Sequence, residues 1–298
     1  MSDIRSVNKI TILAVKIVVF IFLNCSLITV FFIYCLFIQK YLYIVTAAQY
    51  MNKLIKNKKI YAVIICYNAA PVLAETYKRI DKELFDKIYL FDDNSPDGSA
   101  EIAKKFDWIV IKNEKNLGHG GNLKKALQTA FEDGADYAIE ILADNQYSPN
   151  EIVKAKQKLL DNYDLIIGSR FQNKNPFLKD GMPFMRYVTN KLMSLITNFL
   201  CRIKLTEFHT GCKIFSKNLC EKVPYQNNSN NYLFSFEIIL QAAFYKLKYG
   251  EISISSSYEG YRQSCGYFDG LIYLLGNFKV IVLFFLAKFN FYKHKLFK

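Results

Sequence analysis

Two short acidic segments of the 298-residue chain have side chains suited to binding a charged ligand. Asp92 and Asp93 open the run Asp-Asp-Asn-Ser-Pro-Asp-Gly, whose carboxylates can accept hydrogen bonds from a base or a ribose. The same run is also good turn chemistry. Asp144 and Gln146 stand two residues apart, and their oxygens can hold Mg²⁺ or Mn²⁺, which would bridge a diphosphate and neutralise a leaving group. A solvated turn is the alternative for this second segment.

A glycine-rich segment at residues 116–121 reads Asn-Leu-Gly-His-Gly-Gly and opens a predicted helix. Glycines let the backbone approach a ligand, and a helix N-terminus favours an anion. The segment follows the third predicted strand and has the wrong spacing for a dinucleotide fingerprint, and the sequence contains no P-loop. These observations make Gly118 a candidate ligand contact and exclude a P-loop NTPase.

Short apolar runs alternate with amphipathic segments from residue 59 onward, and the polar clusters described above follow the apolar runs. We expect strands at 60–66, 85–91, 108–111, 137–142, 165–168, 212–215 and 251–255. We expect helices at 72–80, 121–131, 148–160, 184–200 and 234–243. This pattern predicts an α/β domain with a mostly parallel central sheet flanked by helices, in which ligands bind at the carboxyl ends of the strands.

An uncharged apolar run at residues 17–38 predicts a transmembrane helix, because about 22 residues rising ~1.5 Å each would span a bilayer core. The lysines that follow the run favour a cytoplasmic catalytic domain, and so a single-pass protein of the inner cell membrane. A re-entrant hairpin and a buried soluble helix are alternatives. We therefore expect a membrane anchor within residues 1–50.

The C-terminal segment, residues 266–298, contains a second apolar run at 271–287 that Gly276, Asn277 and Lys279 interrupt. Lysines follow it, as in a helix that lies on an anionic surface. A second membrane span and a plain core helix are alternatives. The catalytic domain is expected between these two ends, at residues 58–262.

Composition narrows the class of protein further. With 52% hydrophobic and 22% charged residues, the chain is too apolar to be disordered and too charged to be a many-pass channel. The net charge of +13 suits anionic partners, although a solvated lysine-rich face would give the same number, and no nucleic-acid recognition motif occurs. Seven cysteines without a Cys-x-x-Cys pair argue against a disulfide framework or a zinc site.

The motifs occur in a fixed order, and together they resemble family 2 glycosyltransferases of the GT-A fold. The resemblance is strongest to the branch of dolichyl-phosphate mannose synthase and the bacterial polyprenyl-phosphate glycosyltransferases, and it extends over residues 59–262. The order is Ile-Ile-Cys-Tyr-Asn at 64–68, the Asp-Asp run at 92–98, Asn-Leu-Gly at 116–118, Ala-Asp-Asn-Gln at 143–146 and Gly-Ser-Arg-Phe at 168–171.

The resemblance implies a role for each matching residue. The nucleotide sugar, linked to UDP or GDP, would contact Ile65, Tyr67, Asp92, Asp93, Gly118, Ala143 and Arg170. Asp144 and Gln146 would hold Mg²⁺ or Mn²⁺, and Arg186 and Lys213 would meet an acceptor phosphate. The catalytic set would be Asp144, Arg170, Glu207 and Arg262, with Arg262 closing over the diphosphate.

The sequence departs from the family pattern near the metal position. The family usually has a second carboxylate two residues before Asp144, where Leu142 stands here. A Glu commonly follows the Tyr-Asn pair, where Ala69 stands here. A cation would therefore have fewer protein ligands than usual.

The resemblance predicts an inverting glycosyltransferase at a membrane, with a polyprenyl phosphate (undecaprenyl or dolichyl) as acceptor. Such a phosphate is already an anion and needs no general base. The first alternative is transfer to a hydroxyl of a glycan or lipid-linked saccharide, for which Glu207 or His209 would be the base. The second is an inactive GT-A module that acts as a membrane partner. A homo-oligomer is compatible with each of these readings.

Overall fold

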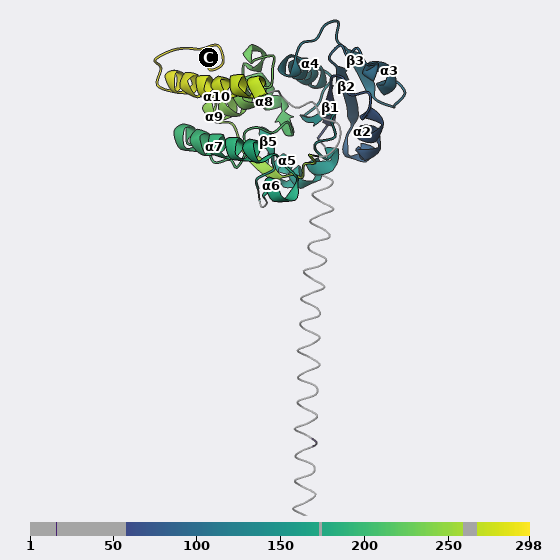
Figure 1. Ribbon diagram of the computed structural model, residues 1–298, viewed down its shortest axis with the longest axis horizontal. Helices are drawn as coiled ribbons and strands as arrows, with labels where there is room; N and C mark the ends of the chain where they lie inside the picture. The colour runs from purple at the N-terminus through teal and green to yellow at the C-terminus, as the bar shows by residue number, and fades with distance from the viewer. Residues whose placement is uncertain (1–15, 17–57, 173–174, 259–266) are drawn as a thin grey trace, which may run out of the picture. The chain divides into compact units, whose positions relative to one another are not determined.

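The computed structural model describes residue 16 and residues 58–172, 175–258 and 267–298. A seven-stranded sheet in the order β3-β2-β1-β4-β6-β5-β7 runs through this part of the chain (Figure 1). Its strands are β1 Ile60–Cys66, β2 Lys87–Asp92, β3 Ile109–Lys112, β4 Tyr137–Leu142, β5 Leu165–Ser169, β6 Lys213–Ser216 and β7 Tyr249–Ser253. The pairing is parallel except at β6, which runs antiparallel to both β4 and β5. The prediction of a mostly parallel sheet is therefore confirmed.

The central strand β1 explains why the sheet is covered on both faces. Every residue of β1 is buried, and alternate residues enter different cores. Tyr61, Val63 and Ile65 pack with α4 His119–Glu132, α9 Phe234–Phe244 and α10 Tyr267–Lys288. The other side chains of β1 pack with α2 Leu73–Arg79, α3 Ser99–Ala103 and η2 Pro149–Ala155. A continuous apolar run is thus what a strand with helices on both faces requires.

The remaining described helices are short, apart from one. They are η1 Lys82–Leu84, α5 Lys156–Leu160, α6 Pro176–Lys179, α7 Phe184–Cys201, α8 Lys217–Lys222 and η3 Tyr225–Asn227. The helix expected at 148–160 is in fact η2 followed by α5, and the Ser148 side chain makes no capping hydrogen bond. Helices α3, α6 and α8 are not among the helices expected from the sequence.

An aromatic cluster closes the β3 side of the domain. The ring of Trp108, which is 6% exposed, packs edge-on against Tyr77 and Phe106 at centroid distances of 5.4 and 5.0 Å. Tyr77 and Phe106 themselves stack at 4.3 Å. These contacts fix α2 against the segment that leads into β3.

The two predicted membrane segments have different outcomes. The expected transmembrane helix at 17–38 lies outside the described residues. Within the described part of the chain, α10 is the one helix whose length and composition would allow it to cross a membrane. Figure 1 shows α10 beside α9, with which it is in contact.

Candidate functional site

Three parallel strands end together and bring their following loops to one edge of the sheet. The register pairs Cys66 of β1 with Asp92 of β2, and Ile65 of β1 with Leu142 of β4. Because β1 lies between β2 and β4, the Asp93 and Asp144 loops lie on either side of the Tyr67 loop. The two loops are therefore about two strand spacings, or roughly 10 Å, from each other. Tyr67 is 40% exposed at this edge.

An asparagine in the left-handed region follows each of these three strands. Asn68, Asn94 and Asn145 have φ values of 50°, 60° and 59°. Asparagine tolerates this conformation better than other side chains, and each residue turns the chain sharply away from the sheet. The sequence thus ends all three strands in tight turns at the same edge.

Asp93 is buried and holds the loop that follows β3. Its Oδ1 accepts hydrogen bonds from Asn113 Nδ2 at 2.9 Å and from the backbone N–H of Leu117 at 2.8 Å. Asn113 also donates to Asn122 in α4, at 2.9 Å. Asp92 is fully buried, and its Oδ2 accepts the N–H of Ser95. Asp93 therefore fixes the Asn-Leu-Gly segment relative to β2. The hydrogen bond from Asn113 to Asp93 was not expected from the sequence.

The glycines of that segment serve close packing. A Cβ at Gly118 would lie 2.6 Å from the carbonyl oxygen of Asn230, and one at Gly120 would lie 2.3 Å from that of Ser229. The N–H of Gly121 donates to the Asn230 carbonyl at 3.1 Å. In this structure the start of α4 is thus packed against residues 229–231. The nucleotide contact expected of Gly118 stays a prediction.

The Asp144 loop is tied down on both sides. Asn145 receives a hydrogen bond from Thr76 in α2 at 3.0 Å, and its carbonyl accepts one from Arg79 at 2.9 Å. The Gln146 carbonyl accepts the N–H of Ser257 at 2.9 Å, while Asp144 Oδ1 accepts the N–H of Gln146 at 3.0 Å. Asp144 and Gln146 are both half-buried. This anchoring holds both predicted metal ligands at the sheet edge.

The donor set at Asp144 fits a hard divalent cation that receives most of its ligands from the substrate. Asp144 and Gln146 offer oxygen atoms, the donors that Mg²⁺ and Mn²⁺ prefer. Among the described residues, no group of three or more His, Cys, Asp and Glu side chains could hold a metal. Asp144 and Gln146 would hold the ion, and a diphosphate and water would complete its coordination.

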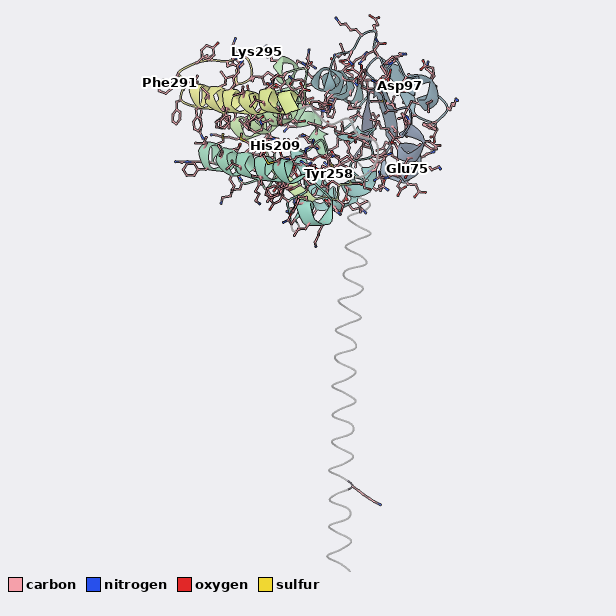
Figure 2. All side chains as sticks on the ribbon, in the orientation of Figure 1. Glu75, Asp97, His209, Tyr258, Phe291 and Lys295 are labelled. Atoms are coloured by element: carbon pink, nitrogen blue, oxygen red, sulfur yellow. The ribbon has the colours of Figure 1, made fainter. Side chains whose placement is uncertain are left out.

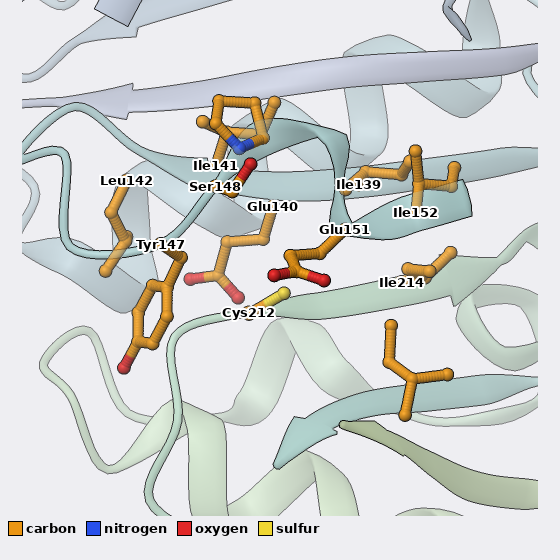
Figure 3. A pocket seen from close by; sticks show the side chains of 12 residues that line it. Ile139, Glu140, Ile141, Leu142, Tyr147, Ser148, Glu151, Ile152, Cys212 and Ile214 are labelled. Atoms are coloured by element: carbon orange, nitrogen blue, oxygen red, sulfur yellow. The ribbon is translucent and has the colours of Figure 1, made fainter. Parts of the chain in front are cut away.

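Leu142 has a packing role in the place of the usual carboxylate. A Cβ at Gly211 would lie 2.6 Å from Leu142 Cδ1, so the leucine fits directly against that glycine. Leu142 also lines a pocket of ≈ 10 Å³, together with Tyr147, Glu151 and Cys212 (Figure 3). That volume is about one water molecule, too small for a nucleotide sugar. Burial, followed by the charge of Glu140, raises the pKa of the Cys212 thiol to about 12, so the thiol is unreactive.

Arg170 and Glu207 form a buried ion pair beside this loop. The Arg170 side chain is 3% exposed and that of Glu207 is fully buried. Glu207 Oε2 accepts the Arg170 backbone N–H at 2.7 Å, and Oε1 accepts Nε at 2.8 Å as well as Nη2. Burial alone would lower the pKa of the Arg170 guanidinium, but the Glu207 charge outweighs it and raises that pKa well above its ordinary value. Both oxygens of Glu207 are thus engaged by Arg170.

Two tyrosines that the sequence analysis missed connect Arg170 to its surroundings. Arg170 Nη1 donates to the Tyr258 hydroxyl, and the Arg186 guanidinium lies over the Tyr258 ring at 5.9 Å. The Tyr147 ring lies 6.0 Å from the Arg170 guanidinium carbon. Arg170, Arg186 and the Asp144 loop are therefore neighbours, linked through Tyr258 and Tyr147. Tyr258 stands four residues before Arg262 in the sequence, but Arg262 lies outside the described residues.

Lys213 lies in the interior, in a second cluster of buried charges. The β4–β6 register pairs Ile139 with Ile214, so Glu140 and Lys213 stand opposite each other on one face of the sheet. Lys213 is fully buried and its ammonium donates to the Thr210 carbonyl. His119 Nε2 lies 3.1 Å from Glu140 Oε1. Burial lowers the pKa of Lys213, and Glu140 opposes that effect. The acceptor contact expected of Lys213 stays a prediction.

His209 is held between α9 and α10. Its ring stacks on Phe236 at a centroid distance of 5.9 Å, and its Nδ1 lies 3.1 Å from the Tyr273 hydroxyl. Burial, followed by the charges of Arg170 and Lys213, lowers the pKa of His209 to about 3. The imidazole is thus neutral at pH 7 and joins α10 to the loop that carries Glu207. Figure 2 shows His209 and Tyr258 in the middle of the domain.

Comparison with known proteins defines the class. The family model for glycosyl transferase family 2 matches residues 61–223. The chain belongs to this family, and it is a glycosyltransferase with a GT-A-like fold, as its motifs implied.

Individual members of the family and solved structures show which glycosyltransferases the chain is similar to. The chain is similar to the UDP-N-acetylglucosamine–dolichyl-phosphate N-acetylglucosaminyltransferase of Methanococcus voltae, at 29% identity over 70% of this chain and 90% of that protein. It is 32% identical to the uncharacterized protein MJ1222 of Methanocaldococcus jannaschii, over 71% of this chain and 87% of that one. The fold is similar to that of glucosyl-3-phosphoglycerate synthase from Mycobacterium tuberculosis, solved with Mn²⁺ and UDP. For that structure the TM-score is 0.59 and the identity 14%, over 80% of this chain and 82% of that one.

Proposed function

We propose that this glycosyltransferase moves a sugar from a nucleotide sugar, UDP- or GDP-linked, to the phosphate of a polyprenyl lipid, undecaprenyl or dolichyl, with inversion at the anomeric carbon. Support comes from the Methanococcus voltae relative, which is named for transfer to dolichyl phosphate and is matched over 90% of its length. The proposal includes a membrane anchor at residues 17–38 and a cytoplasmic catalytic domain.

The observation that carries the choice of acceptor is that Arg170 occupies both carboxylate oxygens of Glu207. A hydroxyl acceptor must lose a proton during attack, and a general base needs an oxygen within reach of it. Both Glu207 oxygens already accept hydrogen bonds from Arg170. A lipid phosphate is an anion at neutral pH, so this site can position it without a base.

The sheet edge supplies the donor side of the proposed reaction. Tyr67 and the Asp93 loop would bind the nucleoside, while Asp144 and Gln146 would hold the Mg²⁺ or Mn²⁺ that comes with the diphosphate. When bound, such an ion stabilises the negative charge that develops on the leaving nucleotide. Arg170 would face the sugar or diphosphate from beside the Asp144 loop, with its guanidinium held in place by Glu207 and Tyr258.

The acceptor side would be formed by Arg186. It stands in the first turn of α7 and contacts Tyr258, which in turn accepts a hydrogen bond from Arg170. A phosphate held by Arg186 would therefore lie close to the donor. Arg262 would add a further positive charge over the leaving diphosphate.

A transfer assay tests the proposal. Full-length protein in detergent, with Mg²⁺ or Mn²⁺, is incubated with UDP- and GDP-sugars and with undecaprenyl or dolichyl phosphate, and glycolipid is read by mass spectrometry. We expect one nucleotide sugar to give polyprenyl-phosphate sugar. D144N should lower the rate on the order of 100-fold or more, because it removes the charged metal ligand.

The matched control is D107N, since Asp107 is an exposed carboxylate that pairs with Lys82 far from this edge. It should retain the wild-type rate. Activity on hydroxyl-bearing glycans but not on prenyl phosphates would overturn the choice of acceptor. Neither binding nor turnover with the whole donor panel would overturn the enzyme itself and favour the inactive module.

A further inference from the structure

The chain that follows β7 belongs to no helix or strand, and its first backbone N–H groups donate to different parts of the domain. We call residues 254–258, Ile-Ser-Ser-Ser-Tyr, the serine segment. The N–H of Ile254 donates to the Ser169 carbonyl at the end of β5 at 3.0 Å, and that of Ser255 donates to Glu151 Oε1 at 3.2 Å. An irregular backbone must satisfy each polar group separately, so these contacts fix where the segment lies.

The next two residues of the serine segment connect two loops that the proposed reaction uses. The N–H of Ser257 donates to the Gln146 carbonyl, in the proposed metal loop, at 2.9 Å. The Ser256 side chain is buried, and its hydroxyl donates to Asp180 Oδ2 at 2.9 Å. Asp180 ends α6 and begins the short loop that leads into α7, whose first turn carries Arg186. The serine segment therefore joins the proposed metal loop to the loop before the proposed acceptor residue.

Tyr258 ends the serine segment in the middle of the domain (Figure 2). Its hydroxyl accepts a hydrogen bond from Arg170 Nη1, and the centre of its ring lies 5.9 Å from the guanidinium carbon of Arg186. A cation above a tyrosine ring is attracted by the π electrons of the ring. A Cβ at Gly181 would lie 3.8 Å from Tyr258 Cβ, so the loop before α7 also packs against this tyrosine. Hydroxyl and ring thus contact different arginines.

The hydrogen bonds of Arg170 indicate what the tyrosine hydroxyl does. A guanidinium has five N–H groups, one on Nε and two on each Nη. Within the described part of the chain, Nε donates to Glu207, while Nη2 donates to Glu207 and to the His209 carbonyl. Nη1 donates one of its two N–H groups to Tyr258. The N–H that Arg170 can offer to a ligand is therefore the second one on Nη1, and Tyr258 helps to set its direction.

We propose that Tyr258 is a positioning residue, and that the serine segment sets the place of the acceptor phosphate relative to the donor. The Tyr258 hydroxyl aims the remaining N–H of Arg170 at the donor, and the ring holds Arg186. The hydrogen bond from Ser256 to Asp180 holds the loop that leads to Arg186. The inference rests on the proposed function, because it concerns the alignment of the two proposed substrates. Loss of alignment lowers kcat, whereas loss of an acceptor contact raises the acceptor KM.

Tyrosine variants separate the two contacts kinetically. Initial rates of the full-length protein in detergent are measured against the concentrations of the nucleotide sugar and of undecaprenyl or dolichyl phosphate. Y258F loses only the hydroxyl, so kcat should fall on the order of 10-fold while the KM for the lipid phosphate stays unchanged. Y258L also loses the ring, so this KM should rise about 5-fold as well.

The matched control is Y77F. The Tyr77 hydroxyl accepts a hydrogen bond from Lys82 at 2.6 Å and its ring lies under the same ammonium, in the aromatic cluster near β3. Y77F therefore removes an equivalent hydroxyl from an equivalent cation away from the site, and it should keep the wild-type kcat and KM.

A serine variant tests the contact with the loop before α7. S256A removes the hydroxyl that donates to Asp180, so the KM for the lipid phosphate should rise about 5-fold, with little change in kcat. The control is S255A, because the Ser255 side chain is exposed and its contact with Glu151 uses the backbone N–H, which alanine keeps.

A binding measurement gives a readout that needs no turnover. Titration calorimetry with geranyl phosphate, in the presence of Mn²⁺ and UDP, should show weaker binding to Y258L and S256A and wild-type binding to Y258F. Wild-type constants in all three variants, or equal kinetic defects in Y258F and Y258L, would overturn the inference and leave the transferase in place. A wild-type protein that neither binds nor turns over the two substrates would instead refute the proposed function, and the inference with it.

Discussion

At the scale of single residues, the candidate site contains the buried ion pair Arg170–Glu207 and two further buried charges, Glu140 and Lys213, which stand opposite each other on β4 and β6. A buried pair adds little net stability, but removal of one partner leaves an uncompensated charge in the interior. Arg170 and Glu207 lie beside the Asp144 loop, and Lys213 supports the loop that carries Glu207 because its ammonium donates to the Thr210 carbonyl. The interaction of these buried charges can therefore be tested through the free energy of unfolding of the protein.

Replacement of Glu207 by Gln should leave Arg170 buried without a counter-charge. We expect the free energy of unfolding to fall by about 3–5 kcal/mol, measured by urea denaturation of the detergent-solubilised protein. The control is E101Q, because Glu101 is exposed and its nearest cation, Lys112, is 3.6 Å away. E101Q should leave the unfolding curve unchanged, and an equally unchanged curve for E207Q would contradict the buried pair.

The opposite charges of Glu140 and Lys213, which face each other across β4 and β6, predict that one substitution rescues the other. E140L should cost about 3–5 kcal/mol of unfolding free energy, because Lys213 then lacks its counter-charge. The double variant E140L/K213M replaces both charges by apolar side chains and should recover most of that loss, because Lys213 is then no longer left as a buried charge without an opposite charge. Chemical denaturation of the two variants gives the comparison. A double variant as unstable as E140L would show that the two residues do not act as a pair.

At the residue scale, a motif can be placed along the chain from the sequence alone, and the roles predicted for its residues stay predictions. Asp93, Asp144 and Arg170 could be placed at the edge of the sheet because each closely follows a predicted strand. Tyr258 was missed because its partner, Arg170, is 88 residues away in the sequence. Glu140 was missed because Lys213 stands opposite it on an adjacent antiparallel strand. Such pairings depend on sheet register, which no local pattern reveals.

At the scale of elements, the start of α4 shows how closely the glycine-rich segment packs. The carbonyl oxygens of Ser229 and Asn231 would lie 2.3 and 2.8 Å from a Cβ at Gly120. These glycines therefore permit contact between α4 and the segment before α9. A methyl group there must displace backbone.

G120A should accordingly destabilise the protein by about 1–3 kcal/mol, the usual cost of overpacking. The matched control is G270A in α10, where a Cβ would meet nothing within 4 Å. Since alanine favours helix, G270A should be neutral or stabilising by up to about 1 kcal/mol. Thermal unfolding followed by circular dichroism distinguishes the two, and equal melting temperatures would refute the close packing.

The sequence predicted every strand of the described sheet to within a few residues, because apolar runs between turns are a strong signal. It did not predict α3 and α8, which are five and six residues long and carry too few turns for a periodic pattern. The antiparallel direction of β6 was also beyond it, since direction depends on how the intervening α7 returns the chain.

At the scale of the whole molecule, stability should depend on pH through His209. Its pKa is about 3 in the folded chain and 6.5 when unperturbed. Below pH 6.5, His209 therefore binds a proton in the unfolded chain, whereas in the folded chain it stays neutral until the pH falls to about 3. The contribution of the neutral imidazole is complete above 6.5 and is lost as the pH falls toward 3.

We expect the unfolding free energy to fall by up to about 1.4 kcal/mol per pH unit from this group in that window. H209Q lacks the titration but can still bind the Tyr273 hydroxyl. The difference between wild type and H209Q, measured by urea denaturation from pH 7 to 4, isolates the effect from that of the carboxylates. A constant difference across the window would contradict it.

The single tryptophan of the chain has a practical consequence for such measurements. Trp108 packs against Tyr77 and Phe106 at the β3 end, so its fluorescence emission reports directly on unfolding of that end. It reports on unfolding of the α9–α10 region only if the two regions unfold cooperatively. Ellipticity at 222 nm, by contrast, averages over all helices. Superimposable curves from the two signals would mean that the β3 end of the sheet and the C-terminal helices unfold as one unit.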